Sequence, residues 1–357
     1  MRLLKILFLL PILSLAQTIS TLSSLSNEIA ESSGLLYLNN QIITHNDSGG
    51  EAALYEIDSL TGTVVRKVII ENAINTDWED ICADETSIYI GDVGNNTGNR
   101  TDLKIYKINI NDYFNNDTVV AEIIHFEYAD QSNYSNQLFT TNYDAEALIV
   151  LDDSLYLFSK NWANSNCTIY ALPKDSGSYQ ISAIDTLENT GLITGASLNS
   201  FSNKLILTSY ALINAAIIEV FNFHSGIFSN GTINKYTINT SASHQIEGVC
   251  TLSEFEYLLS AENNSSGEAS LYKLTTNEVS ITKTSNAYSI YPNPCNKELY
   301  INNSTNLQFD IYTITGKHLL RSFNSPINTS ELTSGVYILK WTEKEKLKSH
   351  SYRICVN

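Results

Sequence analysis

The 357-residue sequence has little proline, methionine or cysteine: five Pro, one Met and five Cys. No two cysteines form a CxxC pair, and His is not clustered with Cys, so the usual thiolate zinc sites are excluded. The odd count and wide spread of the cysteines also argue against a disulfide framework. We expect them to be small buried apolar side chains. They are Cys82, Cys167, Cys250, Cys295 and Cys355.

Long apolar runs are also lacking, apart from Ile6 to Leu13 near the start of the chain. Arg2 and Lys5 precede this run, and Ser14-Leu15-Ala16 follows it. This pattern predicts a secretory signal peptide over residues 1–16, cut before Gln17. The run is too short to cross a bilayer. We therefore expect an exported mature chain without a transmembrane segment, either soluble or attached to a surface.

Basic residues are scarce, with 21 Lys and Arg against 38 Asp and Glu, a net charge of −17. The acidic excess lies in residues 17–287, whereas residues 288–357 carry a small basic excess. A body this acidic does not bind nucleic acid through its phosphates. A high acidic charge is consistent with an extracellular protein that binds cations. It can equally just keep the protein soluble.

What the sequence does contain is a repeated β-hairpin pattern. Short β-branched and aromatic runs turn at Asn, Asp or Ser residues and return to a polar end. The pattern begins at Glu31, Glu79, Glu146, Gly195 and Glu247. The intervals between these positions are 48, 67, 49 and 52 residues. A period of about 40–50 residues is typical of four-stranded propeller blades.

The sequence therefore predicts an all-β chain with a β-propeller over residues 17–282. Five blades are preferred, and six are possible if residues 111–141, inside the longest interval, form another blade. Residues 18–30 should form a strand that completes the last blade, because circular closure removes an exposed sheet edge. Residues 283–287 are a polar linker. Residues 288–357 alternate apolar and polar positions and predict a small C-terminal β-sandwich.

The C-terminal module resembles the sorting domain of cargo of the bacterial type IX secretion system. The matching pieces are Tyr291-Pro292-Asn293-Pro294, Asp310 with Gly316-Lys317, Asn328 with Ser330 and Leu332, and Gly335-Val336-Tyr337. The end of the chain departs mildly from the family, since it is basic only at Arg353. The resemblance implies that residues 288–357 are read by the type IX machinery after export to the periplasm. The mature protein would then be released or held at the outer-membrane surface.

The body resembles the propellers of the esterase-like phytase and SdiA-regulated-like families. The matching pieces are Asn46-Asp47-Ser48-Gly49-Gly50, Asp77-Trp78-Glu79-Asp80, Gly91-Asp92-Val93-Gly94-Asn95-Asn96, Ala145-Glu146-Ala147-Leu148, Thr194-Gly195-Ala196 and Gln245-Ile246-Glu247-Gly248-Val249. The resemblance implies a propeller fold for nearly all of residues 28–275. It does not fix an activity, because one fold serves many functions.

Carboxylates at the hairpin ends should converge at one mouth of the propeller channel. Like charges this close need protons or a cation, and hard oxygen ligands favour Ca²⁺ over zinc or copper. The alternative is that they cap strand ends by accepting backbone N–H groups. The candidate metal ligands are Glu31, Asp47, Asp77, Glu79, Asp80, Asp92, Glu146, Glu247 and Glu262.

No residue is assigned a catalytic role, because Asp47-Ser48-Gly49 departs from a GxSxG nucleophile turn. Arg100 and Lys160 flank the expected mouth, where they could hold an anionic ligand or neutralise the acidic ring. Two functions stay open. One is a surface binding module that Ca²⁺ stabilises, and the other is a metal-dependent hydrolase of phosphoesters or other esters.

Overall fold

The computed structural model describes residues 17–211, 214–238, 245–264, 267–276, 290–301, 307–313, 317–343 and 348–356. The predicted signal peptide and the predicted linker lie outside these residues, so both stay predictions. Among the described residues, no helix is long and apolar enough to cross a membrane. The chain divides into two compact units between residues 278 and 279, and each is described by itself.

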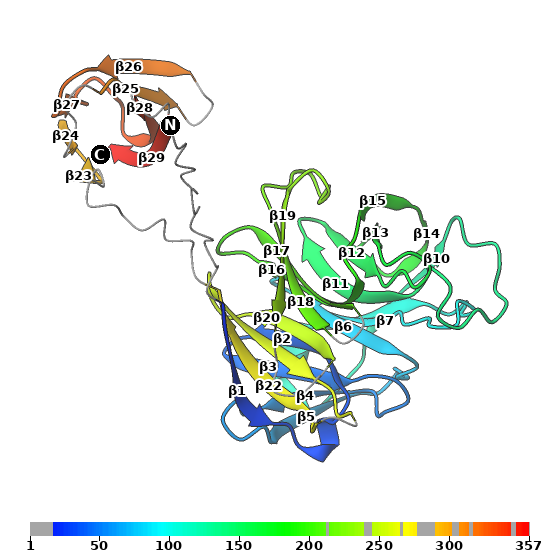
Figure 1. Ribbon diagram of the computed structural model, residues 1–357. Helices are drawn as coiled ribbons and strands as arrows, with labels where there is room; N and C mark the ends of the chain where they lie inside the picture. The colour runs from blue at the N-terminus through cyan, green and yellow to red at the C-terminus, as the bar shows by residue number, and fades with distance from the viewer. Residues whose placement is uncertain are drawn as a thin grey trace, which may run out of the picture. The chain divides into compact units, whose positions relative to one another are not determined.

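The first unit consists of five small sheets, which confirms the all-β prediction (Figure 1). Sheet 1 contains β2 (Ser32–Leu38), β3 (Gln41–Asn46), β4 (Ala53–Ile57), β5 (Val64–Ile70) and β9 (Thr118–Val119). Sheet 2 contains β6 (Trp78–Ala83), β7 (Ser87–Asp92), β8 (Lys104–Asn109), β10 (Glu122–Tyr128) and β14 (Gly177–Ile181). Sheet 3 contains β11 (Ala145–Leu151), β12 (Ser154–Ser159), β13 (Cys167–Pro173) and β15 (Ala183–Leu187).

The two remaining sheets of this unit have four strands each. Sheet 4 contains β16 (Leu192–Asn199), β17 (Lys204–Ala211), β18 (Asn214–Phe221) and β19 (Thr232–Ile238). Sheet 5 contains β20 (Ile246–Thr251), β21 (Glu256–Ala261), β22 (Ser270–Thr275) and β1 (Thr18–Ser24). Each sheet begins with one of the predicted hairpins, and the strands within each hairpin are antiparallel.

The first strands of the five sheets, here called the inner strands, contact one another in a ring. β2 lies beside β6, β6 beside β11, β11 beside β16, β16 beside β20, and β20 beside β2. Alternate residues of a strand pack on opposite neighbours. In β11, Ala147 and Ile149 belong to the core between sheets 3 and 4, whereas Leu148 belongs to the core between sheets 2 and 3. The two-residue period of a strand thus explains why these strands are apolar on both faces.

The turn between β2 and β3 shows how the local sequence sets a hairpin. Asn39 and Asn40 both have positive φ, 49° and 64°. A two-residue hairpin turn of this kind matches the twist of the strands, and Asn tolerates it better than most residues. This agrees with the repeated pattern, which predicts hairpin turns at Asn, Asp or Ser residues.

The longest interval between hairpins forms no sheet of its own. Residues 110–144, all described, contain α1 (Ile110–Asn115), β9, β10 and a loop. Asn109 caps α1 by accepting the N–H groups of Asn111 and Asp112, which explains a short helix that the sequence pattern did not predict. β9 pairs in parallel with β5, and β10 belongs to sheet 2. The strands in this interval therefore extend neighbouring sheets.

The second unit contains two further sheets. One consists of β23 (Ile290–Tyr291), β24 (Glu298–Ile301) and β27 (Ile327–Asn328). The other consists of β26 (His318–Ser322), β25 (Phe309–Thr313), β28 (Gly335–Glu343) and β29 (Lys348–Val356). Leu299 of the first sheet shares a core with Phe309, Ile311 and Leu339 of the second. All five cysteines of the chain are free in this structure.

The N-terminal strand completes sheet 5, as predicted. β1 pairs antiparallel with β22, from Thr18 opposite Thr275 to Ser24 opposite Ser270. A 3₁₀ turn, η1 (Asn27–Ile29), follows, and Ile29 is fully buried in the core between sheets 5 and 1. The two ends of the first unit are therefore joined by backbone hydrogen bonds.

We expect a chain that starts at Glu31 to aggregate or dimerise, because losing β1 leaves the edge of β22 unpaired. Size-exclusion chromatography and urea unfolding measure this, with a chain that starts at Gln17 as the control. A shortened chain that stays monomeric with an unchanged urea midpoint would contradict the role of β1.

Candidate metal centre

Each inner strand carries a β-bulge near its start, at the same place in the hairpin. The register shifts lie between Ser32 and Leu35, Trp78 and Asp80, Ala145 and Ala147, Ile193 and Gly195, and Ile246 and Gly248. A bulge leaves its extra residue outside the ladder and re-aims the side chain. The residues placed this way are Ser33, Glu79, Glu146, Thr194 and Glu247.

The five bulge residues divide into two kinds. The Ser33 Oγ donates to the Glu79 carbonyl at 2.7 Å, and the Thr194 Oγ1 donates to the Ile246 carbonyl at 2.6 Å. These two hydroxyls tie neighbouring inner strands together. Glu79, Glu146 and Glu247 are also buried, but they place carboxylates at the end of the ring.

Two further sets of residues lie at this end, as the strand registers show. On the returning strands, the residues one position beyond the partner of the residue before each bulge are Asp47, Val93, Lys160, Tyr210 and Glu262; Tyr210 lies inside β17, and the other four follow their strands. The residues two positions before the bulge residues are Glu31, Asp77, Asp144, Leu192 and Gln245. We call the charged members of these sets, together with the three bulge glutamates, the mouth.

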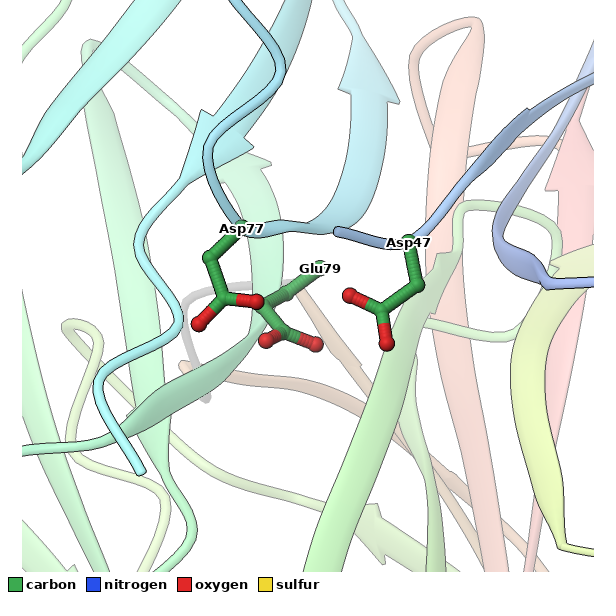
Figure 2. Close-up of side chains that lie close together, drawn as sticks. All are labelled: Asp47, Asp77 and Glu79. Atoms are coloured by element: carbon green, nitrogen blue, oxygen red, sulfur yellow. The ribbon is translucent and has the colours of Figure 1, made fainter. Parts of the chain in front are cut away.

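Within the described residues, one group of three carboxylates in the mouth has the spacing of a metal site. One oxygen each of Asp47, Asp77 and Glu79 lies within 4.8 Å of the other two. Figure 2 shows the three carboxylates facing one common space. Glu79 is 95% buried, yet no hydrogen-bond donor or basic side chain of the described residues pairs with its carboxylate. The Asp47 Oδ1 is likewise buried without a hydrogen-bond partner in the described part of the chain.

A glycine makes room for these carboxylates. A Cβ atom at Gly94 would collide with the Glu79 Oε1 and would lie 2.5 Å from the Asp77 Oδ2. The Gly94 backbone is fixed against the group, because its N–H donates to the Asp77 carbonyl at 3.1 Å and its carbonyl accepts from Arg100 at 2.8 Å. Only a glycine fits here without displacing the carboxylates.

The electrostatics of the group disfavour three ionised carboxylates. Burial, followed by the charge of Asp77, raises the pKa of Asp47 to about 7. Burial and the charge of Asp144 raise the pKa of Asp77 to about 6. Burial and the charge of Glu146 raise the pKa of Glu79 well above its usual value. A proton or a cation is therefore needed near neutral pH.

The other side of the mouth surrounds Lys160. Its Nζ lies 3.0 Å from the Glu146 Oε2, and the side chain is almost fully buried. Burial alone would lower the pKa of Lys160, but Glu146 and Glu247 raise it well above its usual value. Burial raises the pKa of Glu247 to about 8, against the opposing charge of Lys160. Burial and the charge of Asp47 raise the pKa of Glu262 to about 7.

Asp80 lies deeper in the ring and already has hydrogen-bond partners. Its Oδ1 accepts the N–H of Ile81 at 2.8 Å, and its Oδ2 accepts those of Leu148 at 2.9 Å and Ala196 at 3.1 Å. These N–H groups belong to β6, β11 and β16. The carboxylate is fully buried, which raises its pKa well above the usual value. Asp80 thus links three inner strands through backbone hydrogen bonds. It does not belong to the group of Asp47, Asp77 and Glu79.

Three other candidates are also placed differently from the expectation. The Asp92 carboxylate pairs with Arg100 at 2.8 Å and with Lys104 at 3.1 Å. Glu31 is exposed, because Ser33 holds the bulge position of β2 that the sequence had matched to Glu31. Arg100 also pairs with Asp102 at 3.0 Å. In these ion pairs, carboxylates of the protein itself neutralise the charge of Arg100.

Sequence reasoning missed several residues in and around the mouth. Asp144 was not among the candidate ligands, yet it is fully buried and accepts a hydrogen bond from the Trp162 Nε1 at 2.7 Å. Gly94 and Tyr210 were not among the candidates. Asp144 could have been found from its spacing, because it stands two residues before a bulge glutamate, as Asp77 does.

Comparisons with known proteins identify the end of the chain. Residues 289–357 match the family model described as the secretion system C-terminal sorting domain. This match confirms the type IX sorting tail predicted from its motifs. A tail of this class implies export to the cell surface or secretion. No curated protein matches the chain.

Several solved structures are distantly similar. PorZ, a surface component of the type IX secretion system of Porphyromonas gingivalis, is 13% identical over 93% of this chain, with a TM-score of 0.38. This chain covers 47% of PorZ, about half its length. Aldose sugar dehydrogenase from Streptomyces coelicolor is 8% identical, with coverages of 74% and 99% and a TM-score of 0.43.

A third example is the exo-β-1,3-galactanase of Phanerochaete chrysosporium, 10% identical with coverages of 96% and 94% and a TM-score of 0.43. Likenesses this distant carry no conclusion about activity or ligand. The resemblance of the body to the phytase-like propellers is not tested by these matches and stays a prediction.

We expect Asp80→Asn to lower the free energy of unfolding by about 1–3 kcal/mol, because an amide nitrogen leaves at least one buried N–H without an acceptor. Asp80→Ala should cost more, since it removes all three acceptor contacts. Urea unfolding in the presence of chelator measures both, with Asp153→Asn on the surface as the control. An Asp80→Asn protein as stable as the wild type would show that this carboxylate does not join the strands.

Proposed function

We propose that the chain is an exported five-bladed β-propeller that binds one Ca²⁺ at its mouth and acts as a binding module at the cell surface. The ring of inner strands supports the five-bladed interpretation, because each of the five sheets lies beside the next and the last lies beside the first. The sorting tail supports the location.

The observation that carries the calcium proposal is the group of Asp47, Asp77 and Glu79. Two oxygens bound to one Ca²⁺ at 2.3–2.6 Å are at most about 5 Å apart. The three oxygens lie within 4.8 Å of one another, a spacing at which the group could hold one ion. The Glu79 carboxylate is buried among other carboxylates, and such a group needs a proton or a cation, which a purely structural turn does not supply.

The chemistry of the ligands favours calcium. All three side chains offer hard carboxylate oxygens, and the group includes no imidazole or thiolate. Calcium accepts irregular oxygen cages, whereas magnesium requires a nearly octahedral one. An exported protein also meets calcium at the concentrations that extracellular sites use.

A bound ion would join two sheets. Asp47 follows β3 of sheet 1, whereas Asp77 and Glu79 lie at the start of β6 in sheet 2. An ion held by both sheets stabilises only the folded chain, because unfolding separates its ligands. Calcium would thus act first as a stabiliser of the ring.

A metal-dependent esterase or phosphoesterase is the second candidate. The carboxylates of Glu247 and Glu262 favour it, because their pKa values of about 8 and 7 suit a general base near neutral pH. Such an enzyme also needs an open position on the ion for a water molecule or substrate. We place this activity second because it needs both an ion with an open position and a general base, whereas the stabilising role needs the ion alone.

We expect Ca²⁺ added to chelated protein to raise its melting temperature by about 5–10 °C. The linkage free energy is about 2.7 kcal/mol at a hundredfold excess over the dissociation constant, and one kcal/mol moves a domain of this size by roughly 2–4 °C. Glu79→Gln should remove most of the rise, because it removes a charge from the site. Exposed Glu188→Gln is the control. Calorimetry and elemental analysis measure the effect.

Two glycine variants separate the site from general stability. Gly94→Ala should abolish the calcium response, since its Cβ needs the space of the carboxylates. Gly50→Ala should keep it, because a Cβ there meets only atoms at 3.7 Å and beyond. A wild-type melting temperature that ignores both EDTA and millimolar Ca²⁺ would refute the calcium site.

For the second candidate, we expect no calcium-dependent hydrolysis of aryl phosphates or aryl esters by the purified chain. Absorbance assays with and without Ca²⁺ measure this. Turnover that disappears in both Glu79→Gln and Glu247→Gln, but persists in Glu188→Gln, would favour the enzyme over the binding module.

A further inference from the structure

A buried side-chain amide connects the two sheets that carry the proposed calcium ligands. Asn75 lies in the connection between β5 and β6, and the residue is only 5% exposed. Its Nδ2 donates to the Asn46 carbonyl at 3.0 Å and to the Asp47 carbonyl at 2.5 Å. Its Oδ1 accepts the N–H of Trp78 at 3.2 Å. An amide nitrogen has two hydrogens, so one short side chain supplies both donors and the acceptor.

These hydrogen bonds hold together the two segments that carry the ligands. Asp47 directly follows β3 of sheet 1, whereas Trp78 begins β6 of sheet 2 and stands between Asp77 and Glu79 in the chain. Figure 2 shows Asp47 on one segment, facing Asp77 and Glu79 on the other. The Asn75 amide is thus bonded to the backbone of one ligand on one side and to the backbone between two ligands on the other.

The two segments need such a connection, because their carboxylates repel one another until a cation binds. One oxygen of each carboxylate lies within 4.8 Å of the other two. The Asp47 Oδ1 has no hydrogen-bond partner among the described residues, so the position of this ligand depends on how its backbone is held. Ligands that are already assembled lose less conformational freedom when the ion binds, and the affinity is then higher.

We propose that Asn75 is a positioning residue that assembles the calcium site before the ion binds. It acts through the backbone of the two segments and is not itself a ligand. The inference rests on the proposed function for the ion. Removing the amide should weaken Ca²⁺ binding about 10–100-fold, the usual effect of losing a side chain that orients metal ligands.

The test uses the full chain and measures the dissociation constant of Ca²⁺ by titration calorimetry, at a temperature where each protein is folded in chelator. Asn75→Ala removes all three hydrogen bonds and should raise the dissociation constant about 10–100-fold. The number of bound ions should stay at one, because the three ligands remain. Asn75→Ser keeps one donor and should raise the dissociation constant less.

Asn72→Ala is the matched control. Asn72 lies in the same connection, and its amide bonds in both directions to the backbone of Ala121, at 2.9 Å each. Its loss removes a similar pair of hydrogen bonds away from the ligands. The melting temperature in chelator should therefore fall for both alanine variants, whereas the dissociation constant should rise for Asn75→Ala alone. A purely structural role of Asn75 would change only the melting temperature.

Each outcome decides the inference. A folded Asn75→Ala protein with the wild-type dissociation constant overturns it, and so does an Asn72→Ala protein that is weakened as much. If Asn75→Ala does not fold in chelator, Asn75→Ser replaces it, and an unchanged dissociation constant there has the same meaning. Failure of both variants to fold would show a role in the fold instead of the site. In all these cases a wild type that binds one ion leaves the proposed function intact, whereas a wild type that binds none contradicts it.

Discussion

The hydrogen bonds of one buried carboxylate hold the centre of the ring together. Asp80 accepts backbone N–H groups from β6, β11 and β16, and two of these strands lie in other sheets. At the matching position the other inner strands have Gly34, Ala147, Gly195 and Gly248. Small residues at four positions and one carboxylate at the fifth allow a single side chain to reach across. The arrangement of the mouth depends on this contact, because it fixes the strands that carry the bulges.

The bulges turn a structural repeat into a chemical site. An inner strand without a bulge would direct alternate residues toward its two neighbouring sheets, as β7 does with Ile88 and Tyr89. The extra residue lies outside this alternation, so Glu79, Glu146 and Glu247 can be buried and still gather at one end. Burial makes their charges costly, and that cost makes the site responsive to cations.

Much of the fold was predictable from the sequence, because strands and turns depend on local patterns. The five hairpins, the Asn39-Asn40 turn, the pairing of β1 with the last sheet and the sorting tail all follow from short segments. The candidate site was predictable only in part. Asp47, Asp77 and Glu79 do come together, but spacing alone did not reveal the bulge register, so Glu31 was matched to the position of Ser33. The partners of Asp80 in other sheets lie 68 and 116 residues away, and the partners of Asp92 lie 8 and 12 residues away. No local pattern encodes such choices.

Two sheets have a parallel strand pair at one edge, and these pairs limit how the repeats of the chain can be rearranged. β9 leaves the segment between β8 and β10 to join sheet 1, and β14 leaves sheet 3 to join sheet 2. Sheets 1 to 3 thus exchange edge strands, so none of these three repeats contains all the strands of one sheet and no others. Deleting or duplicating one of these repeats would remove a strand from its neighbour. Within the described residues, sheets 4 and 5 lend no strand in this way, and the strands of sheet 4, β16 to β19, are all consecutive in the chain.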